Sequence, residues 1–187
     1  EVRYNNGIQG ANFTQRNVNP PAIIYASATA AIFGGASVEI QGGNAVGLEI
    51  TVPASVTAGV PFTASVRAVD AFGNTADDYD LTWAFTSSDP APFAGVVPGD
   101  YTMVPAADSG MHTFHKAFVL FNGPSQTIQV SDGSLTAVSS PIVVNPGPVG
   151  MFSILAVSPQ PANVVFPLSL EAFDIYGNTK SDHSGAI

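Results

Sequence analysis

The chain has 187 residues, of which 10% are charged and 45% are hydrophobic. This apolar share excludes a disordered chain, which could not bury enough surface to offset its ordering entropy. Five Lys and Arg against fourteen Asp and Glu give a net charge of −9, and five scattered cations cannot form the basic stripe that nucleic-acid phosphates require. The chain has no cysteine, which excludes disulfides, thiolate metal sites and cysteine nucleophiles.

No membrane span is expected in this segment. The two longest uncharged stretches, 17–38 and 133–170, are interrupted by Pro and Gly. Neither provides the continuous apolar run of about 20 residues that a spanning helix needs.

Apolar side chains alternate with other side chains along three segments, 48–52, 62–68 and 80–85. Because successive side chains of a strand point to opposite faces, each segment is predicted to be a strand. Segments rich in Gly, Asn, Asp and Pro separate the strands, and the 3.6-residue period of a helix is not evident in the sequence. The sequence therefore predicts an all-β fold built as an antiparallel sandwich.

An internal repeat organises the chain, since segment 61–75 recurs 104 positions later as 165–179. Just upstream, Val46-Gly47 matches Val149-Gly150 with a shift of one residue. The repeat divides the chain into the C-terminal part of one unit (1–44), a complete unit (45–147) and the N-terminal part of a following unit (148–187). The alternative is two unrelated sandwiches that share a common turn.

The order of several short motifs resembles the bacterial immunoglobulin-like repeat domains of large surface and secreted proteins, and the final strands are similar to filamin-type domains. The matching segments are 58–62, 70–75, 85–90, 107–114, 126–133 and 140–146. The resemblance implies tandem immunoglobulin-like β-sandwiches that serve as rods, spacers or adhesive modules. It also implies an extracellular or cell-surface location. Fold resemblance alone does not fix which role applies.

Turn and core residues follow from the same pattern. The turns are expected at Asp-x-x-Gly-Asn, where Gly supplies a positive φ and the Asp carboxylate accepts backbone N–H groups. Trp83 falls on the third strand, where immunoglobulin sandwiches bury a tryptophan. The turn residues are Asp70, Gly73, Asn74, Asp174, Gly177 and Asn178, and the expected core residues are Trp83, Val66, Phe114 and Phe118.

Candidate chemical sites are few. Asp70, Asp77, Asp78 and Asp80 form the densest run of carboxylates and are candidate ligands for Ca²⁺, which binds oxygen donors. The alternative, which we favour, is a solvated acidic turn. His112 and His115 lie three apart on a strand, so their rings point to opposite faces and cannot share a metal ion without a bulge. No Gly-x-Ser-x-Gly elbow is present.

The sequence therefore indicates a non-catalytic structural or adhesive segment of a bacterial or archaeal cell-surface protein, S-layer or extracellular filament. The alternative functions are a spacer module of a secreted multi-domain carbohydrate-active enzyme, and an enzyme in its own right. No cofactor is expected apart from the candidate calcium. The expected partners are neighbouring repeats of the same chain, or copies joined head to tail by strand complementation.

Overall fold

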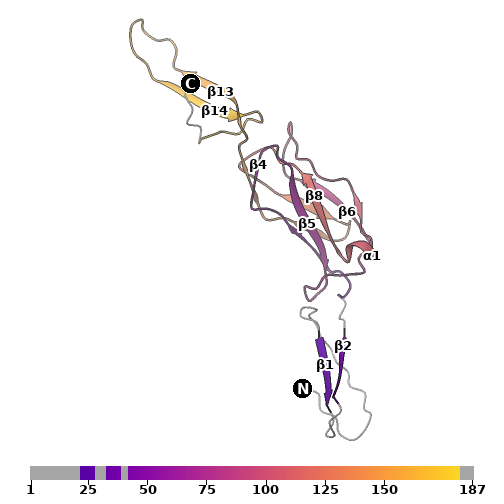
Figure 1. Cartoon of the computed structure of the whole chain (residues 1–187). Coiled ribbons are helices and arrows are strands. Elements are labelled where there is room, and N and C mark those ends of the chain that lie inside the picture. The colour runs from indigo at the N-terminus through magenta and orange to yellow at the C-terminus, as the bar shows by residue number, and fades with distance from the viewer. Residues whose placement is uncertain (1–21, 28–32, 39–41, 182–187) are drawn as a thin grey trace.

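The computed structural model describes residues 22–27, 33–38 and 42–181. At the N-terminal side, strands β1 (Ala22–Ser27) and β2 (Phe33–Val38) pair as an antiparallel hairpin (Figure 1). Of the predicted partial unit 1–44, residues 1–21, 28–32 and 39–41 lie outside the described residues.

The centre of the chain is a two-layered β structure. One layer is the antiparallel sheet β3–β5–β8, formed by Gly47–Thr51, Phe62–Val69 and Met111–Phe118. The facing layer has the order β11–β10–β6–β7, formed by Thr136–Val138, Ile128–Ser131, Thr82–Ser87 and Tyr101–Thr102. The prediction of an all-β fold is confirmed, and the helix α1 (Pro105–Asp108) is a single turn.

A third small sheet closes the end of this sandwich, next to the C-terminal part of the chain. It has the order β4–β12–β9, with strands Ser55–Thr57, Ile142–Asn145 and Ser125–Gln126. β4 runs parallel to β12, whereas β9 is antiparallel to it. The chain therefore leaves the sheet of β3, pairs with β12 through β4 in this small sheet, and returns to the first sheet at β5.

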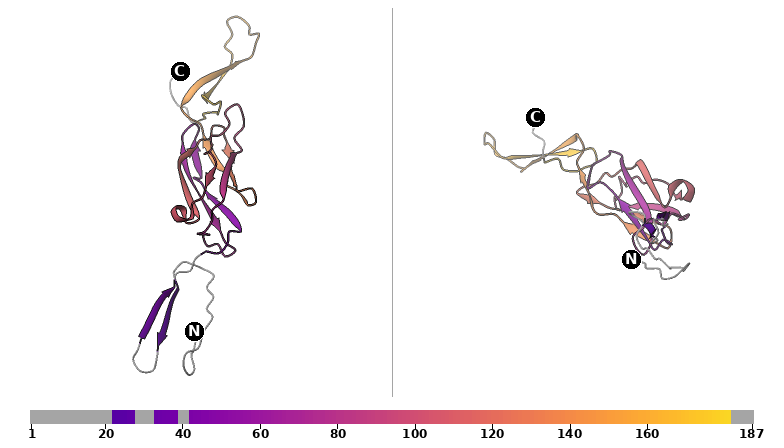
Figure 2. Two further views of the ribbon diagram at one scale, coloured as in Figure 1. Left: turned by 90° about the vertical axis from the view of Figure 1, so that its right-hand side faces the viewer. Right: turned by 60° about the horizontal axis from the view of Figure 1, so that its bottom comes forward.

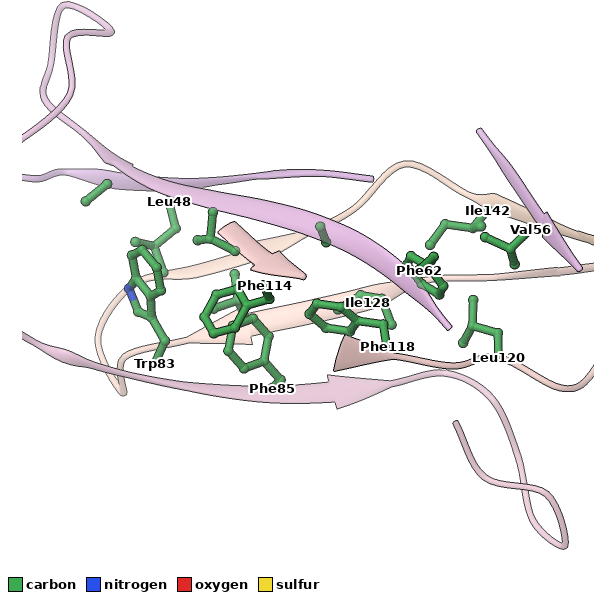
Figure 3. Close-up of a cluster of buried hydrophobic side chains, with 14 of the residues drawn as sticks. Leu48, Val56, Phe62, Trp83, Phe85, Phe114, Phe118, Leu120, Ile128 and Ile142 are labelled. Carbon is green, nitrogen blue, oxygen red and sulfur yellow. The ribbon is translucent and has the colours of Figure 1, made fainter. Parts of the chain in front are cut away.

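The sandwich encloses one aromatic core (Figure 3). Trp83, Val66 and Phe118 have no exposed surface. Phe114 is buried and its ring contacts those of Trp83 and Phe118. The ring of Phe85 packs edge-on against Phe114, at a centroid distance of 4.9 Å. The core arises from strict alternation, because every second side chain of β5 from Phe62 onward is buried.

Alternation misplaces one residue of the predicted third strand. In the alternating segment 80–85, Leu81 would lie on the same face as Trp83, but the strand begins at Thr82 and Leu81 is 48% exposed. Its backbone carbonyl accepts the N–H of Met103, at 3.1 Å. The side chain is therefore outside the two layers although its main chain still pairs.

Two further strands, β13 (Val149–Ala156) and β14 (Leu168–Asp174), form an antiparallel hairpin beyond the end of the sandwich (Figures 1 and 2). Met151 pairs with Phe173, which is the pairing of Gly47 with Val69 displaced by 104 positions. An irregularity between Val149 and Met151 inserts one residue. This bulge accounts for the one-residue shift between Val46-Gly47 and Val149-Gly150 in the sequence.

The hairpin exposes the side chains that its counterpart in the sandwich buries. Phe62 is 8% exposed at the start of β5, whereas Phe166, 104 positions later, is 43% exposed. Leu168 is exposed where Ala64 is buried. The difference follows from packing, since the described residues place no second layer over β13 and β14.

Candidate functional site

The turn after β5 is organised by the carboxylate of Asp70. Its Oδ1 accepts the backbone N–H groups of Phe72 at 2.8 Å and Asn74 at 2.9 Å. Its Oδ2 accepts the side-chain amide of Asn74 at 3.0 Å and the backbone N–H of Gly43 at 2.9 Å. Gly73 has φ +80°, a value that side chains other than glycine adopt only with strain.

The turn after β14 repeats this arrangement atom for atom. Oδ1 of Asp174 accepts the backbone N–H groups of Tyr176 and Asn178, each at 2.9 Å. Oδ2 accepts the side-chain amide of Asn178 at 2.8 Å and the backbone N–H of Gly147 at 2.9 Å. Gly177 has φ +91°. The two turns therefore share one geometry as well as one sequence motif.

In both turns the aspartate holds a glycine that lies upstream of the strand pair that the turn follows. Gly43 precedes β3, and Gly147 lies between β12 and β13 in the segment Asn145-Pro146-Gly147-Pro148. The separation from glycine to aspartate is 27 residues in each case. Each turn thus fixes the segment that leads into its strand pair, β3–β5 or β13–β14.

The hydrogen bonds set the ionisation of both carboxyls. The N–H of Gly43, followed by the amide of Asn74, holds the pKa of Asp70 well below its usual range. Burial alone would raise the pKa of Asp174, but the donors of Asn178 and Gly147 outweigh it and the pKa is lowered. Both groups are therefore charged acceptors that stabilise the turns at neutral pH.

Sequence reasoning identified the aspartates, glycines and asparagines of the two turns but missed Gly43 and Gly147. Their contribution is a backbone N–H, which leaves no side-chain pattern. The signal that could have found them is the spacing, because Gly43 and Gly147 are also 104 positions apart.

The four carboxylates considered for calcium have different surroundings. Asp70 lies in the turn network, with both oxygens already accepting N–H groups. Asp77 is half-buried and faces the N–H of Gly42 at 3.4 Å, while Asp78 and Asp80 are exposed and line a pocket of about 430 Å³. Within residues 42–181, His, Asp and Glu side chains form no group of three or more that could hold a metal ion. Calcium binding stays a prediction.

Tyr79 and Asp132, which line the same pocket, belong to a polar relay that sequence reasoning missed. The indole N–H of Trp83 donates to the Tyr79 hydroxyl at 3.1 Å, and that hydroxyl donates to Asp132 at 2.5 Å. Burial, together with the bond to Asp132, raises the pKa of Tyr79. Tyr79 and Asp132 are 53 positions apart, so no local sequence pattern predicts their contact. The relay satisfies the only polar atom of the core tryptophan.

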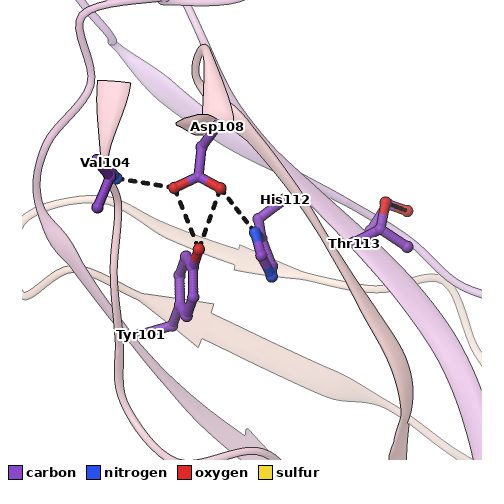
Figure 4. Close-up of polar contacts among 6 residues, drawn as sticks. Tyr101, Val104, Asp108, His112 and Thr113 are labelled. Atoms are coloured by element: carbon purple, nitrogen blue, oxygen red, sulfur yellow. Dashed lines mark hydrogen bonds and ion pairs between the residues drawn. The ribbon is translucent and has the colours of Figure 1, made fainter. Parts of the chain in front are cut away.

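A second polar cluster lies between α1 and β8 (Figure 4). Asp108 accepts the Tyr101 hydroxyl at 3.0 Å and the backbone N–H of Val104 at 2.8 Å, and it pairs with Nδ1 of His112 at 2.7 Å. Burial raises the pKa of Tyr101, and the bond to Asp108 adds to that shift. The hydroxyl of Thr113 points away from this cluster and bonds Ser65 at 2.9 Å (Figure 4). The Thr113 hydroxyl is therefore not hydrogen-bonded to His112. The pair Asp108–His112 anchors the short helix to the sheet.

Comparison with known proteins gives little further guidance. No family model and no curated protein matches the chain. Among solved structures, the chain is similar to surface layer protein SbsC, domains 4–9, with 19% identity and a TM-score of 0.39, over 87% of this chain and 25% of that chain. Domains 1–6 of the same protein give 17% identity and a TM-score of 0.36, over 87% of this chain and 21% of that chain. TM-scores this low carry no argument about fold or function.

The chain thus spans a quarter or less of the length of these SbsC structures. Among the residues that the structure describes, helices are too short to cross a membrane.

Proposed function

We propose that the chain is a segment of immunoglobulin-like repeats with a non-catalytic structural or adhesive role in a bacterial or archaeal cell-surface protein, S-layer or extracellular filament. The observation that carries this proposal is the recurrence of one turn geometry, centred on Asp70 and Asp174, at two successive junctions. A catalytic domain has no need of a recurring junction, whereas a rod of repeated units needs one at every step.

The immunoglobulin-like assignment is supported by the path of the strands. β3 and β5 belong to one layer, while β4, between them in the chain, leaves that layer and runs parallel to β12, the last strand of the sandwich. Trp83 is the second residue of β6, the strand that follows β5, and its ring packs between Tyr79 and Phe114. A two-layered sandwich of about 100 residues around such a tryptophan is the arrangement of immunoglobulin-type domains.

The proposed partner of the hairpin β13–β14 is the remainder of a neighbouring repeat in the same array. The exposed row of Phe166 and Leu168 corresponds to the row that β5 buries against the facing sheet. Head-to-tail complementation would bring residues 1–44 of another copy to the hairpin. With the spacing of 104, residues 148–187 correspond to 44–83 and residues 1–44 correspond to 105–148. Together they lack an equivalent of 84–104, which includes the core residue Phe85. Two copies joined in this way would therefore form a sandwich with an incomplete core.

Charge supports the surface role. A net charge of −9 spread over an otherwise weakly charged chain makes neighbouring rods repel one another weakly and stay apart in solution. The location that fits this composition is extracellular or on the cell surface.

Small-angle X-ray scattering from the whole chain tests the rod. A compact domain of this length would have a radius of gyration of about 16 Å. We expect a clearly larger value, an asymmetric distance distribution, and the scattering peak of a folded protein. A symmetric distribution with the compact radius would contradict the proposal.

Light scattering over a range of concentrations tests the choice of partner. We expect a monomer whose mass is independent of concentration. A mass that rises steadily with concentration would instead favour head-to-tail complementation between copies.

A further inference from the structure

The turn 174–178, which follows β14, contacts the end of the central sandwich in addition to forming its own internal hydrogen bonds. The ring of Tyr176 packs against Phe121, with a centroid distance of 4.9 Å, and edge-on against Phe93, at 5.3 Å. On the other side, a Cβ placed on Gly59 would overlap the Tyr176 hydroxyl. The ring therefore sits in a space that three separate segments of the sandwich leave open.

Asn178 makes the polar half of this contact. Its side-chain Nδ2 donates to the backbone carbonyl of Phe121 at 2.7 Å, and its Oδ1 accepts the backbone N–H of Gly123 at 2.7 Å. The remaining N–H of the amide donates to Asp174 at 2.8 Å. Both N–H groups and the oxygen of the amide are thus used, and two of these three hydrogen bonds cross the junction.

The linker by itself would not orient the hairpin. In Pro146-Gly147-Pro148 both prolines have a restricted φ, but the glycine between them has no side chain to limit its own φ. Asp174 holds it through the N–H of Gly147. Tyr176 and Asn178 then attach the same turn to the sandwich, so the chain is fixed at the linker and again at the docked turn.

We propose that the turn 174–178 is a docking element that fixes the direction of the hairpin β13–β14 relative to the central sandwich. Its receptor is the end of the preceding sandwich, formed by Gly59, Phe93, Phe121 and Gly123. The aromatic ring supplies contact area, and the paired amide bonds fix the rotation about the long axis, because both must form at once. This inference rests on the proposed function and adds that the junction between the sandwich and the hairpin is stiff.

The test uses residual dipolar couplings of the whole chain in a weakly aligning medium. For the native chain, the couplings of β13 and β14 should fit the same alignment tensor as those of β5 and β8. In Tyr176→Ala they should lose magnitude relative to the sandwich. Ile175→Ala is the matched control, since that side chain belongs to the same turn and is 68% exposed, and it should behave like the native chain.

A second variant separates loss of docking from loss of the hairpin. Phe93→Ala removes a ring from the receptor side and leaves 148–187 unchanged, so it should loosen the hairpin while the cross-strand chemical shifts of β13 and β14 persist. Separate alignment tensors in the native chain, or couplings unchanged in both Tyr176→Ala and Phe93→Ala, would overturn the docking proposal. If scattering shows an elongated chain but the couplings require separate alignment tensors, the docking proposal is overturned and the proposed function still stands.

Discussion

The carboxylate of Asp174 accepts the backbone N–H of Gly147 at 2.9 Å, across 27 positions of the chain. Asp70 holds Gly43 in the same way. A single short side chain in each unit therefore joins a turn to the linker that enters the unit. This arrangement couples local folding to the path of the whole chain, because a turn that forms correctly also positions the preceding residues.

The core tryptophan is expected to dominate the stability of the central sandwich. Trp83→Ala should reduce the free energy of unfolding by about 3–5 kcal/mol, because it leaves a large cavity between the layers. Urea unfolding followed by far-ultraviolet circular dichroism measures the change. Leu81→Ala, at an exposed apolar position two residues earlier, is the control and should change the free energy by about 0.5 kcal/mol or less. Equal effects of the two substitutions would contradict the core described above.

The relay from Trp83 through Tyr79 to Asp132 should make a measurable contribution to the free energy of unfolding. Tyr79→Phe keeps the ring but leaves the buried indole N–H without its acceptor, at a cost of about 1–3 kcal/mol. Unfolding monitored by the fluorescence of the single tryptophan reports the change and the altered environment of the indole. Asp80→Asn, an exposed carboxylate of the same loop, is the control. A native-like midpoint for Tyr79→Phe would show that the relay is dispensable.

Strand alternation made much of the central fold predictable. The row from Phe62 to Ala68 is apolar at every second position because one face of β5 meets the core. The same rule misplaced Leu81, since alternation shows which residues share a face but not where pairing begins. The short helix α1 carried no periodic signal because four residues make barely one turn.

The polar contacts were predictable only where they are local. Asp70 and Asn74 lie within one turn, so their residue types identify the geometry. Asn178 and Gly123 meet across 55 positions, and one of them contributes only backbone. Contacts of this kind depend on how two units come together, and a single sequence contains no direct record of that.

Acid should destabilise the protein. The pKa values of Asp70, Asp108, Asp132 and Asp174 are lowered in the folded chain. Between the folded pKa of each group and its unfolded pKa of about 3.9, the unfolded chain binds more protons than the folded chain. The stabilisation by these groups is therefore complete above about pH 3.9 and is lost as the pH decreases through their folded pKa values. Urea unfolding between pH 7 and 2 measures the slope.

An increase in stability with decreasing pH would have a different cause, so the direction of the change distinguishes the two effects. Protonation of carboxylates also relieves the repulsion that comes from a net charge of −9. If this relief dominated, the protein would become more stable below pH 4, and the hydrogen bonds to the four aspartates would have little energetic weight.

Calcium provides a further test. With both oxygens of Asp70 accepting N–H groups, we expect millimolar Ca²⁺ to leave the melting temperature unchanged, as for a solvated acidic turn. Mg²⁺ at the same concentration is the control for ionic strength. A rise specific to Ca²⁺ that disappears in Asp77→Asn would instead establish the loop as a calcium site.

The most direct test of the recurring junction is a pH titration followed by nuclear magnetic resonance. It records the side-chain carboxyl carbons of Asp70 and Asp174 together with the amide protons of Gly43 and Gly147. Both carboxyls should titrate below the ordinary aspartate range, and each glycine amide should shift at the pH at which its own aspartate is protonated. An ordinary pKa for either carboxyl, with an amide that does not follow it, would contradict the account.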